Sequence, residues 1–138
     1  MKQIEDNRDL TFARARYSFN DVREWKSHWR KDAAKRVKGL PVAIRSQGLM
    51  VVIATLMRED TPYSRHIVDC LAQWILKEAQ HSPLLSSENK EPSGRQLLDA
   101  CMNALRADYV AAEMEAILFL DQVKLYADAL YSTEGKSS

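Results

Sequence analysis

Helix-breaking residues are scarce in this sequence. Its 138 residues include four glycines and four prolines, and runs of β-branched residues are rare. Because glycine and proline mark most turns between short strands, this scarcity disfavours an all-β fold and favours helices almost throughout. A chain of this length is typical of one domain with one core. We therefore predict an all-α fold, a single compact bundle of five to six helices over residues 1–131, followed by a disordered tail at 132–138.

Cysteines and long apolar runs are also few. Cys70 and Cys101 are too few for a disulfide framework, and the polar N-terminus, MKQIEDNRDL, resembles neither a secretory signal nor a transit peptide. We expect reduced thiols and a cytoplasmic protein. The most apolar stretch, residues 49–57, is shorter than the roughly twenty residues that cross a bilayer. It predicts a core helix, and we expect no membrane partner.

Motifs that support catalysis or metal binding are missing. The sequence has no glycine-rich phosphate loop, no HExxH and no nucleophile elbow. Glu113 and Glu115 lie two positions apart, on different faces of a helix, which makes them poor acid–base partners. His66 and Cys70 share a helix face, but a closed zinc site needs four ligands and the other candidates are scattered. We expect no catalytic residue, no metal, no cofactor and no small-molecule substrate.

Local signals mark where helices begin and end. Thr61 with Pro62 is typical of a helix start, and Ser93 with Gln96 has the form of a capping box. Pro41 suits the first turn of the helix that follows Gly39. The predicted segments are a helix over 6–30, a basic segment over 31–38, a core helix over 49–57, a helix over 61–80, a loop over 81–94, and helices over 93–106 and 107–131.

The last predicted helix carries an unusually wide apolar surface. One core stripe comprises Tyr109, Ala112, Ala116, Leu120, Val123, Ala127 and Leu130, and further apolar side chains flank it. A surface helix needs a stripe of roughly 100°, so the wider one indicates burial on more than one side. Either this is the central helix of a small bundle, or part of the stripe meets another protein subunit.

Positive charge is concentrated in the first half of the chain. Residues 1–48 hold twelve Lys and Arg against six Asp and Glu, whereas the remainder holds eight against thirteen. Residues 23–38, REWKSHWRKDAAKRVK, contain seven of these cations, and Lys31, Lys35 and Lys38 share one helical face. Such a row either neutralises phosphates without reading bases or is simply a solvated basic face. The interleaved Trp25 and Trp29 are predicted to pack into the core.

Arg45 is the most distinctive single cation. It precedes the break SQG at residues 46–48, where one helix ends and an apolar helix begins. An arginine beside free backbone N–H groups would suit a phosphate. The alternative is that Arg45 only caps the carbonyls of the preceding helix. A helix-turn-helix DNA-binding domain is disfavoured because the helix after the break is too apolar for recognition.

Two segments resemble a known family. LPVAIRSQGLMVVIATL, residues 40–56, is similar to a pattern of Leu-Pro, an aliphatic-Arg pair, and Gly-Leu opening an apolar helix. YVAAEMEAILFLDQVKLYADAL, residues 109–130, resembles the closing helix of the same family. The family is the small, all-helical subunit of the type III-B (Cmr) CRISPR RNA-guided effector complex. The family often has Asn where Gln47 stands and Trp where Gln122 stands.

The resemblance implies a non-catalytic subunit of an antiviral complex. It further implies that copies of the chain stack as an inner filament beside other subunits and contact the phosphate backbone of target RNA paired to guide RNA, while base pairing reads the sequence. Lys124 is added to the candidate residues because it matches the family's closing helix. The alternative is a helical adaptor that binds protein and no nucleic acid. We assign nucleic-acid binding to Lys31, Lys35, Lys38, Arg45, Gln47 and Lys124.

Overall fold

The computed structural model describes residues 2–86 and 91–132, with side chains described from residue 9 onward. Every regular element in these ranges is helical, so the all-α prediction is confirmed. The elements in chain order are α1 (Lys2–Arg23), α2 (Arg30–Val37), α3 (Leu40–Gln47), α4 (Leu49–Glu59), α5 (Pro62–Gln73), a π-helical turn η1 (Trp74–Glu78), α6 (Gly94–Asn103) and α7 (Arg106–Tyr131). The predicted tail at 132–138 lies almost entirely outside the described residues.

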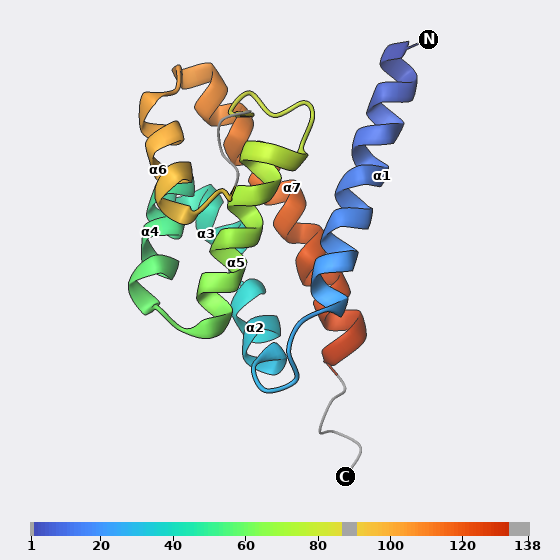
Figure 1. Cartoon of the computed structure of the whole chain (residues 1–138), viewed down its shortest axis with the longest axis vertical. Helices are drawn as coiled ribbons and strands as arrows, with labels where there is room; N and C mark the ends of the chain where they lie inside the picture. The colour runs from blue at the N-terminus through green and yellow to red at the C-terminus, as the bar shows by residue number, and fades with distance from the viewer. Residues whose placement is uncertain (1, 87–90, 133–138) are drawn as a thin grey trace.

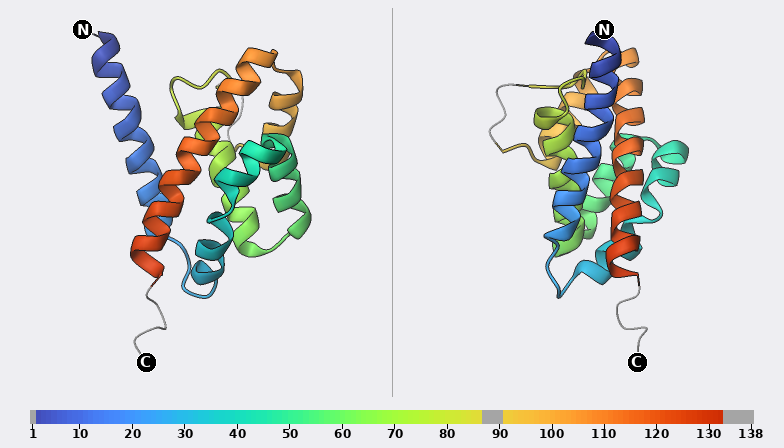
Figure 2. Two further views of the ribbon diagram at one scale, coloured as in Figure 1. Left: turned by 180° about the vertical axis from the view of Figure 1, so that it is seen from behind. Right: turned by 90° about the vertical axis from the view of Figure 1, so that its right-hand side faces the viewer.

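α7 is the organising helix of the bundle. It packs against α1 on one side and against α2 and α3 on the other. α1 and α7 converge toward their C-terminal ends, and the first turns of α1 stand apart from the other helices (Figures 1 and 2). α4, α5 and α6 pack together beside this group. Neighbours on two sides therefore cover the core stripe of α7, whereas Leu118 and Leu125, which flank it, are 44% and 56% exposed.

The core is built from large apolar side chains of several helices. Trp74 stacks on Phe119 with ring centroids 5.5 Å apart, which joins η1 to α7. α4 contributes Leu49, Val52, Ile53 and Leu56, so the apolar run is a core helix as predicted. One expected core residue is wrong: Leu130 is 39% exposed, and its neighbour Tyr131 is buried instead. Tyr131 takes this place because its ring stacks on Trp25 and its hydroxyl donates to the Val22 carbonyl.

The predicted helix over 6–30 ends early, at Arg23, and residues 24–29 form turns. Trp25 explains the break, because its ring is buried against Tyr131 while its Nε1 donates to Asp21 over 3.0 Å. Trp29 is buried as well, so both tryptophans lie in the core as predicted. The chain turns and restarts as α2.

The other helix signals are confirmed by the local geometry. Thr61 and Ser64 form a capping box with Pro62 in the first turn of α5, and Ser93 and Gln96 form another at the start of α6. Pro41 lies in the first turn of α3. These caps satisfy backbone N–H groups that helix starts leave unpaired. They place the helix starts independently of tertiary packing.

Candidate nucleic-acid interface

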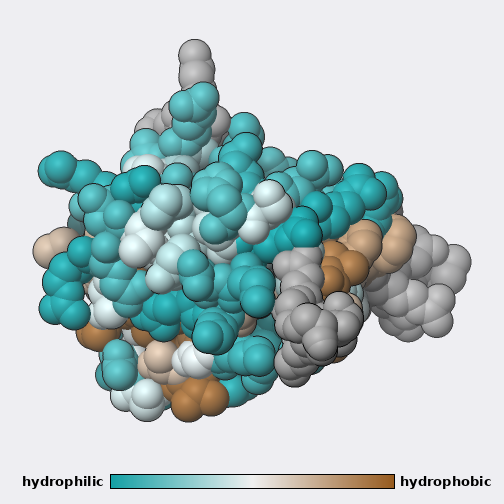
Figure 3. Space-filling model, turned by 90° about the horizontal axis from the view of Figure 1, so that it is seen from below, coloured by the Kyte–Doolittle hydropathy of each residue, from teal (hydrophilic) through white to brown (hydrophobic). Residues whose placement is uncertain are grey.

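α2 presents one buried face and one basic face. Ala33, Ala34 and Val37 are buried, and their short side chains allow α2 to lie close to its neighbours. Lys31 and Lys35 project from the exposed side, and Lys38 caps the C-terminal end. The end of the molecule where α2 lies is covered mainly by hydrophilic side chains (Figure 3). The predicted lysine row is thus a solvent-facing row.

α7 lies opposite the lysine row of α2. A hollow of about 910 Å³ lies between the two helices, and its lining includes Lys31, Lys35 and Lys38 together with the carboxylates of Asp32 and Asp128. A second hollow of about 450 Å³ shares Lys38 and Asp128 and adds Lys124. The two hollows therefore bring together lysines that are up to 93 positions apart in sequence.

Arg45 extends the same surface along α7. Its Nη2 lies 4.0 Å from Asp121 Oδ2, and Asp121 lines the second hollow beside Lys124. Five of the six predicted residues thus lie on one continuous surface. We call it the basic strip: Lys31, Lys35, Lys38, Arg45 and Lys124. Gln47 is exposed at the end of α3, and none of the contacts described for the chain joins it to the strip.

At the SQG break, residues 46–48, the first backbone N–H groups of α4 are bonded to side chains of α7. The N–H of Leu49 donates to Glu113 Oε2 over 2.8 Å, and the N–H of Met50 donates to the Tyr109 hydroxyl over 3.2 Å. The donors expected to await a phosphate are therefore already satisfied by α7. Arg45 on α3 lies opposite Asp121 on α7. A side-chain carboxylate at a helix start also suits the helix dipole.

Gly48 makes this junction possible. Its φ of +95° with ψ of 156° lies in a region that residues with a Cβ rarely adopt, and a Cβ there would lie 3.4 Å from Glu113 Oε2. We expect Gly48→Ala to lower the free energy of unfolding by about 1–2 kcal/mol. Urea denaturation followed by circular dichroism measures this. Gly39→Ala is the matched control, since its Cβ would meet nothing within 4 Å. Equal stability of the two variants would contradict the assigned strain.

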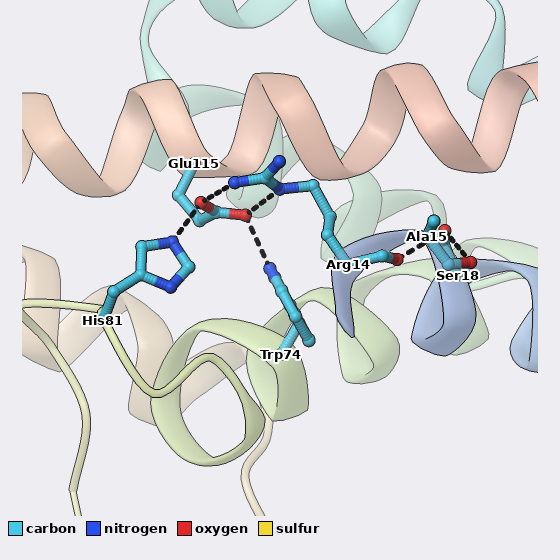
Figure 4. A network of polar contacts seen from close by, with 6 residues as sticks. All are labelled: Arg14, Ala15, Ser18, Trp74, His81 and Glu115. Atoms are coloured by element: carbon cyan, nitrogen blue, oxygen red, sulfur yellow. Dashed lines mark hydrogen bonds and ion pairs between the residues drawn. The ribbon is translucent and has the colours of Figure 1, made fainter. Parts of the chain in front are cut away.

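A cluster of polar side chains surrounds one buried carboxylate, that of Glu115, between α7, α1 and η1 (Figure 4). Glu115 is 5% exposed and accepts two hydrogen bonds from Arg14, over 2.7 and 2.8 Å. The Trp74 indole donates to the same carboxylate over 2.8 Å, and His81 Nε2 lies 2.5 Å from it. Burial alone would raise the pKa of Glu115, but these hydrogen bonds and the Arg14 charge lower it overall. Glu115 is therefore held as a carboxylate.

Sequence reasoning missed this cluster. Glu115 falls among the core positions of α7, three residues after Ala112, and an acidic residue there signals a buried partner. The identity of that partner was not readable, because Arg14 lies 101 positions away. Glu113 and Glu115 do face different neighbours, as their spacing predicted.

His66 and Cys70 both lie beside Asp21. His66 Nε2 is 2.9 Å from the Asp21 carboxylate. Burial opposes protonation of His66, but the hydrogen bond and charge of Asp21 outweigh it and raise its pKa. Burial raises the pKa of the Cys70 thiol well above its usual value. Among the described residues no group of three or more His, Cys, Asp or Glu side chains is placed to hold a metal ion.

Within the part of the chain that the structure describes, no helix is both long enough and apolar enough to cross a membrane.

Comparison with known proteins places the chain in a family. The family model described as CRISPR-associated protein (Cas_Cmr5) matches residues 10–130. The chain belongs to the Cas_Cmr5 family. This confirms the family resemblance carried by residues 40–56 and 109–130, and it makes the chain a CRISPR-associated protein of the type III-B (Cmr) class.

A solved structure of the Cmr5 family has the same fold. The crystal structure of a CRISPR-associated Cmr5 family protein from Thermus thermophilus superposes with a TM-score of 0.70 at 21% sequence identity. The match covers 87% of this chain and 96% of that protein. No curated protein matches the sequence. The Cmr5 fold is thus shared at low identity, and the helical bundle described above is that fold.

Proposed function

We propose that this chain is a non-catalytic small subunit of a type III-B effector complex that contacts the phosphate backbone of target RNA paired to the guide. The observation that carries the proposal is the basic strip. Its five cations come from α2 and its C-cap, from α3 and from α7, and they face solvent along one surface. Lysines without a base-reading motif suit backbone contacts, because base pairing with a guide already supplies the sequence specificity.

The proposal includes neighbouring subunits and further copies of this chain. α7 carries four apolar side chains that are between 44% and 58% exposed: Val110, Met114, Leu118 and Leu125. Exposed apolar residues gathered on one helix are typical of protein contacts. They support stacking beside other subunits. They also favour the second candidate, a protein-only adaptor, should the basic strip prove not to contact RNA.

The proposal predicts that reversing three charges on the strip weakens RNA binding. An assembled complex carrying Lys35→Glu, Lys38→Glu and Arg45→Glu should bind labelled target RNA at least about tenfold more weakly, because each lost phosphate contact forfeits counterion release. The dependence of log affinity on log salt should also become shallower. Filter binding across a salt series measures both quantities.

The matched control reverses three cations that line neither hollow, at Arg58, Arg95 and Arg106. It changes the net charge equally and should leave the salt dependence unchanged. A strip variant with an unaltered salt slope would refute the RNA assignment. If that variant still assembled with the other subunits, the protein-only adaptor would replace the proposal.

A further inference from the structure

Three carboxylates lie among the cations of the basic strip: Asp32 lines the first hollow, and Asp121 and Asp128 line the second. Asp121 and Asp128 lie seven positions apart on α7, with Lys124 between them, so all three share one helix face. Both acids line the second hollow together with Lys38 and Lys124. Asp121 faces Arg45 and Asp128 faces Lys38. Two of the five cations of the strip therefore already have a negative charge opposite them.

The two ion pairs are loose. Lys38 Nζ lies 3.9 Å from Asp128 Oδ1 and Arg45 Nη2 lies 4.0 Å from Asp121 Oδ2, distances too long for hydrogen bonds. Arg36 on α2 offers a contrast, since it makes two hydrogen bonds to Glu59 over 2.7 and 3.0 Å. The loose carboxylates cancel charge without binding the N–H groups of their partners.

The loose pairs add little to stability. Their side chains are between 44% and 58% exposed, and exposed pairs are worth at most a small amount because water and salt screen them. The same two charges matter more to an approaching phosphate, which they repel at close range. Their main physical effect therefore falls on anion binding.

We propose that Asp121 and Asp128 act as competitors of the RNA backbone, occupying Lys38 and Arg45 until phosphates displace them and so holding down the affinity of one subunit. This inference rests on the proposed function. Lys38 and Arg45 exchange a loose carboxylate for a phosphate oxygen, and the displaced carboxylates are left repelling the RNA. A single copy then binds weakly, and several strips along one RNA are needed for tight binding.

The test measures binding of the full chain to a fluorescein-labelled oligouridylate by anisotropy at low and moderate salt. Asp121→Asn with Asp128→Asn should bind about tenfold more tightly than the natural chain, because two repulsive charges are removed. Its salt dependence should be steeper. Asp121→Glu with Asp128→Glu keeps the charges and should show no gain. Glu91→Gln with Asp99→Asn, two exposed acids that line neither hollow, makes the same change in net charge and should also show none.

The outcomes separate this inference from the proposed function. If the asparagine pair binds no more tightly than the natural chain while the triple reversal at Lys35, Lys38 and Arg45 loses binding, the competitor role fails and the RNA surface stands. Weaker binding by the asparagine pair would instead mean that the carboxylates help to hold RNA, and it too overturns the inference. If neither set changes binding, both proposals fail. Thermal melting of each variant confirms that the fold is retained.

Discussion

Glu115→Ala is expected to lower the free energy of unfolding by about 3–5 kcal/mol, the cost of breaking a buried ion pair by removing one partner. Arg14 loses two hydrogen bonds and keeps its charge, at a site where its side chain is 13% exposed. The Trp74 N–H loses its acceptor in the core. The cluster joins α1, η1 and the 79–86 segment to α7, so its loss loosens three connections at once.

Urea denaturation followed by circular dichroism measures this effect. Asp128→Asn is the matched control on the same helix, and it should change the free energy of unfolding by less than about 1 kcal/mol because its pair is exposed. Adding Arg14→Met to the Glu115→Ala chain removes the stranded charge and should restore part of the loss. A Glu115→Ala chain as stable as the control would show that the cluster contributes nothing.

The stabilisation that the Glu115 carboxylate provides is expected to fall as the pH is lowered. Burial opposes ionisation of Glu115, but the hydrogen bonds from Arg14, Trp74 and His81 outweigh it and lower its pKa in the folded chain below the ordinary value of a glutamate. A lowered pKa means that the stabilisation is present above the unfolded value and is lost as pH falls through the folded value. The difference between the natural chain and Glu115→Gln should therefore be largest near neutral pH and shrink below about pH 4.

Gly94→Ala is expected to lower the free energy of unfolding by about 3 kcal/mol, the upper end of the range for overpacking. Gly94 is the first residue of α6 and is buried where this helix meets α4 and α5. A Cβ there would lie 2.4 Å from Val68 Cγ1 and 2.9 Å from Met57 Sδ. The stiff β-branched Val68 cannot easily move aside. Alanine's helix propensity, worth about 1 kcal/mol, is too small to compensate.

Thermal and urea unfolding of Gly94→Ala against Gly39→Ala measures this clash. The Gly39 Cβ would meet nothing within 4 Å, so that variant should be neutral or slightly more stable. Adding Val68→Ala to the Gly94→Ala chain removes the clashing methyl and should cost less than the sum of the single changes. Additive losses would mean that the two side chains do not meet.

Local signals in the sequence predicted much of the fold. The Thr61 and Ser93 caps are recognisable because capping involves residues three positions apart. The core helix from Leu49 was predictable from its composition. The end of α1 was not, because Trp25 leaves the helix to reach Tyr131, a contact between residues 106 positions apart. Helix propensity alone predicts that the helix continues past Arg23.

Some features of the candidate site were likewise predictable from the sequence, and others depend on the tertiary structure. The sequence by itself determined the helical class, the family and the lysine row of α2, because each depends on residue types and short spacings. Only the tertiary structure decided that Lys124 and Arg45 join that row and that Asp121 and Asp128 lie among the cations. It also decided that Glu113 and Tyr109 accept from the backbone donors after Gly48. These relations depend on how α2 and α3 pack against α7, and long-range packing leaves no periodic signal in the chain.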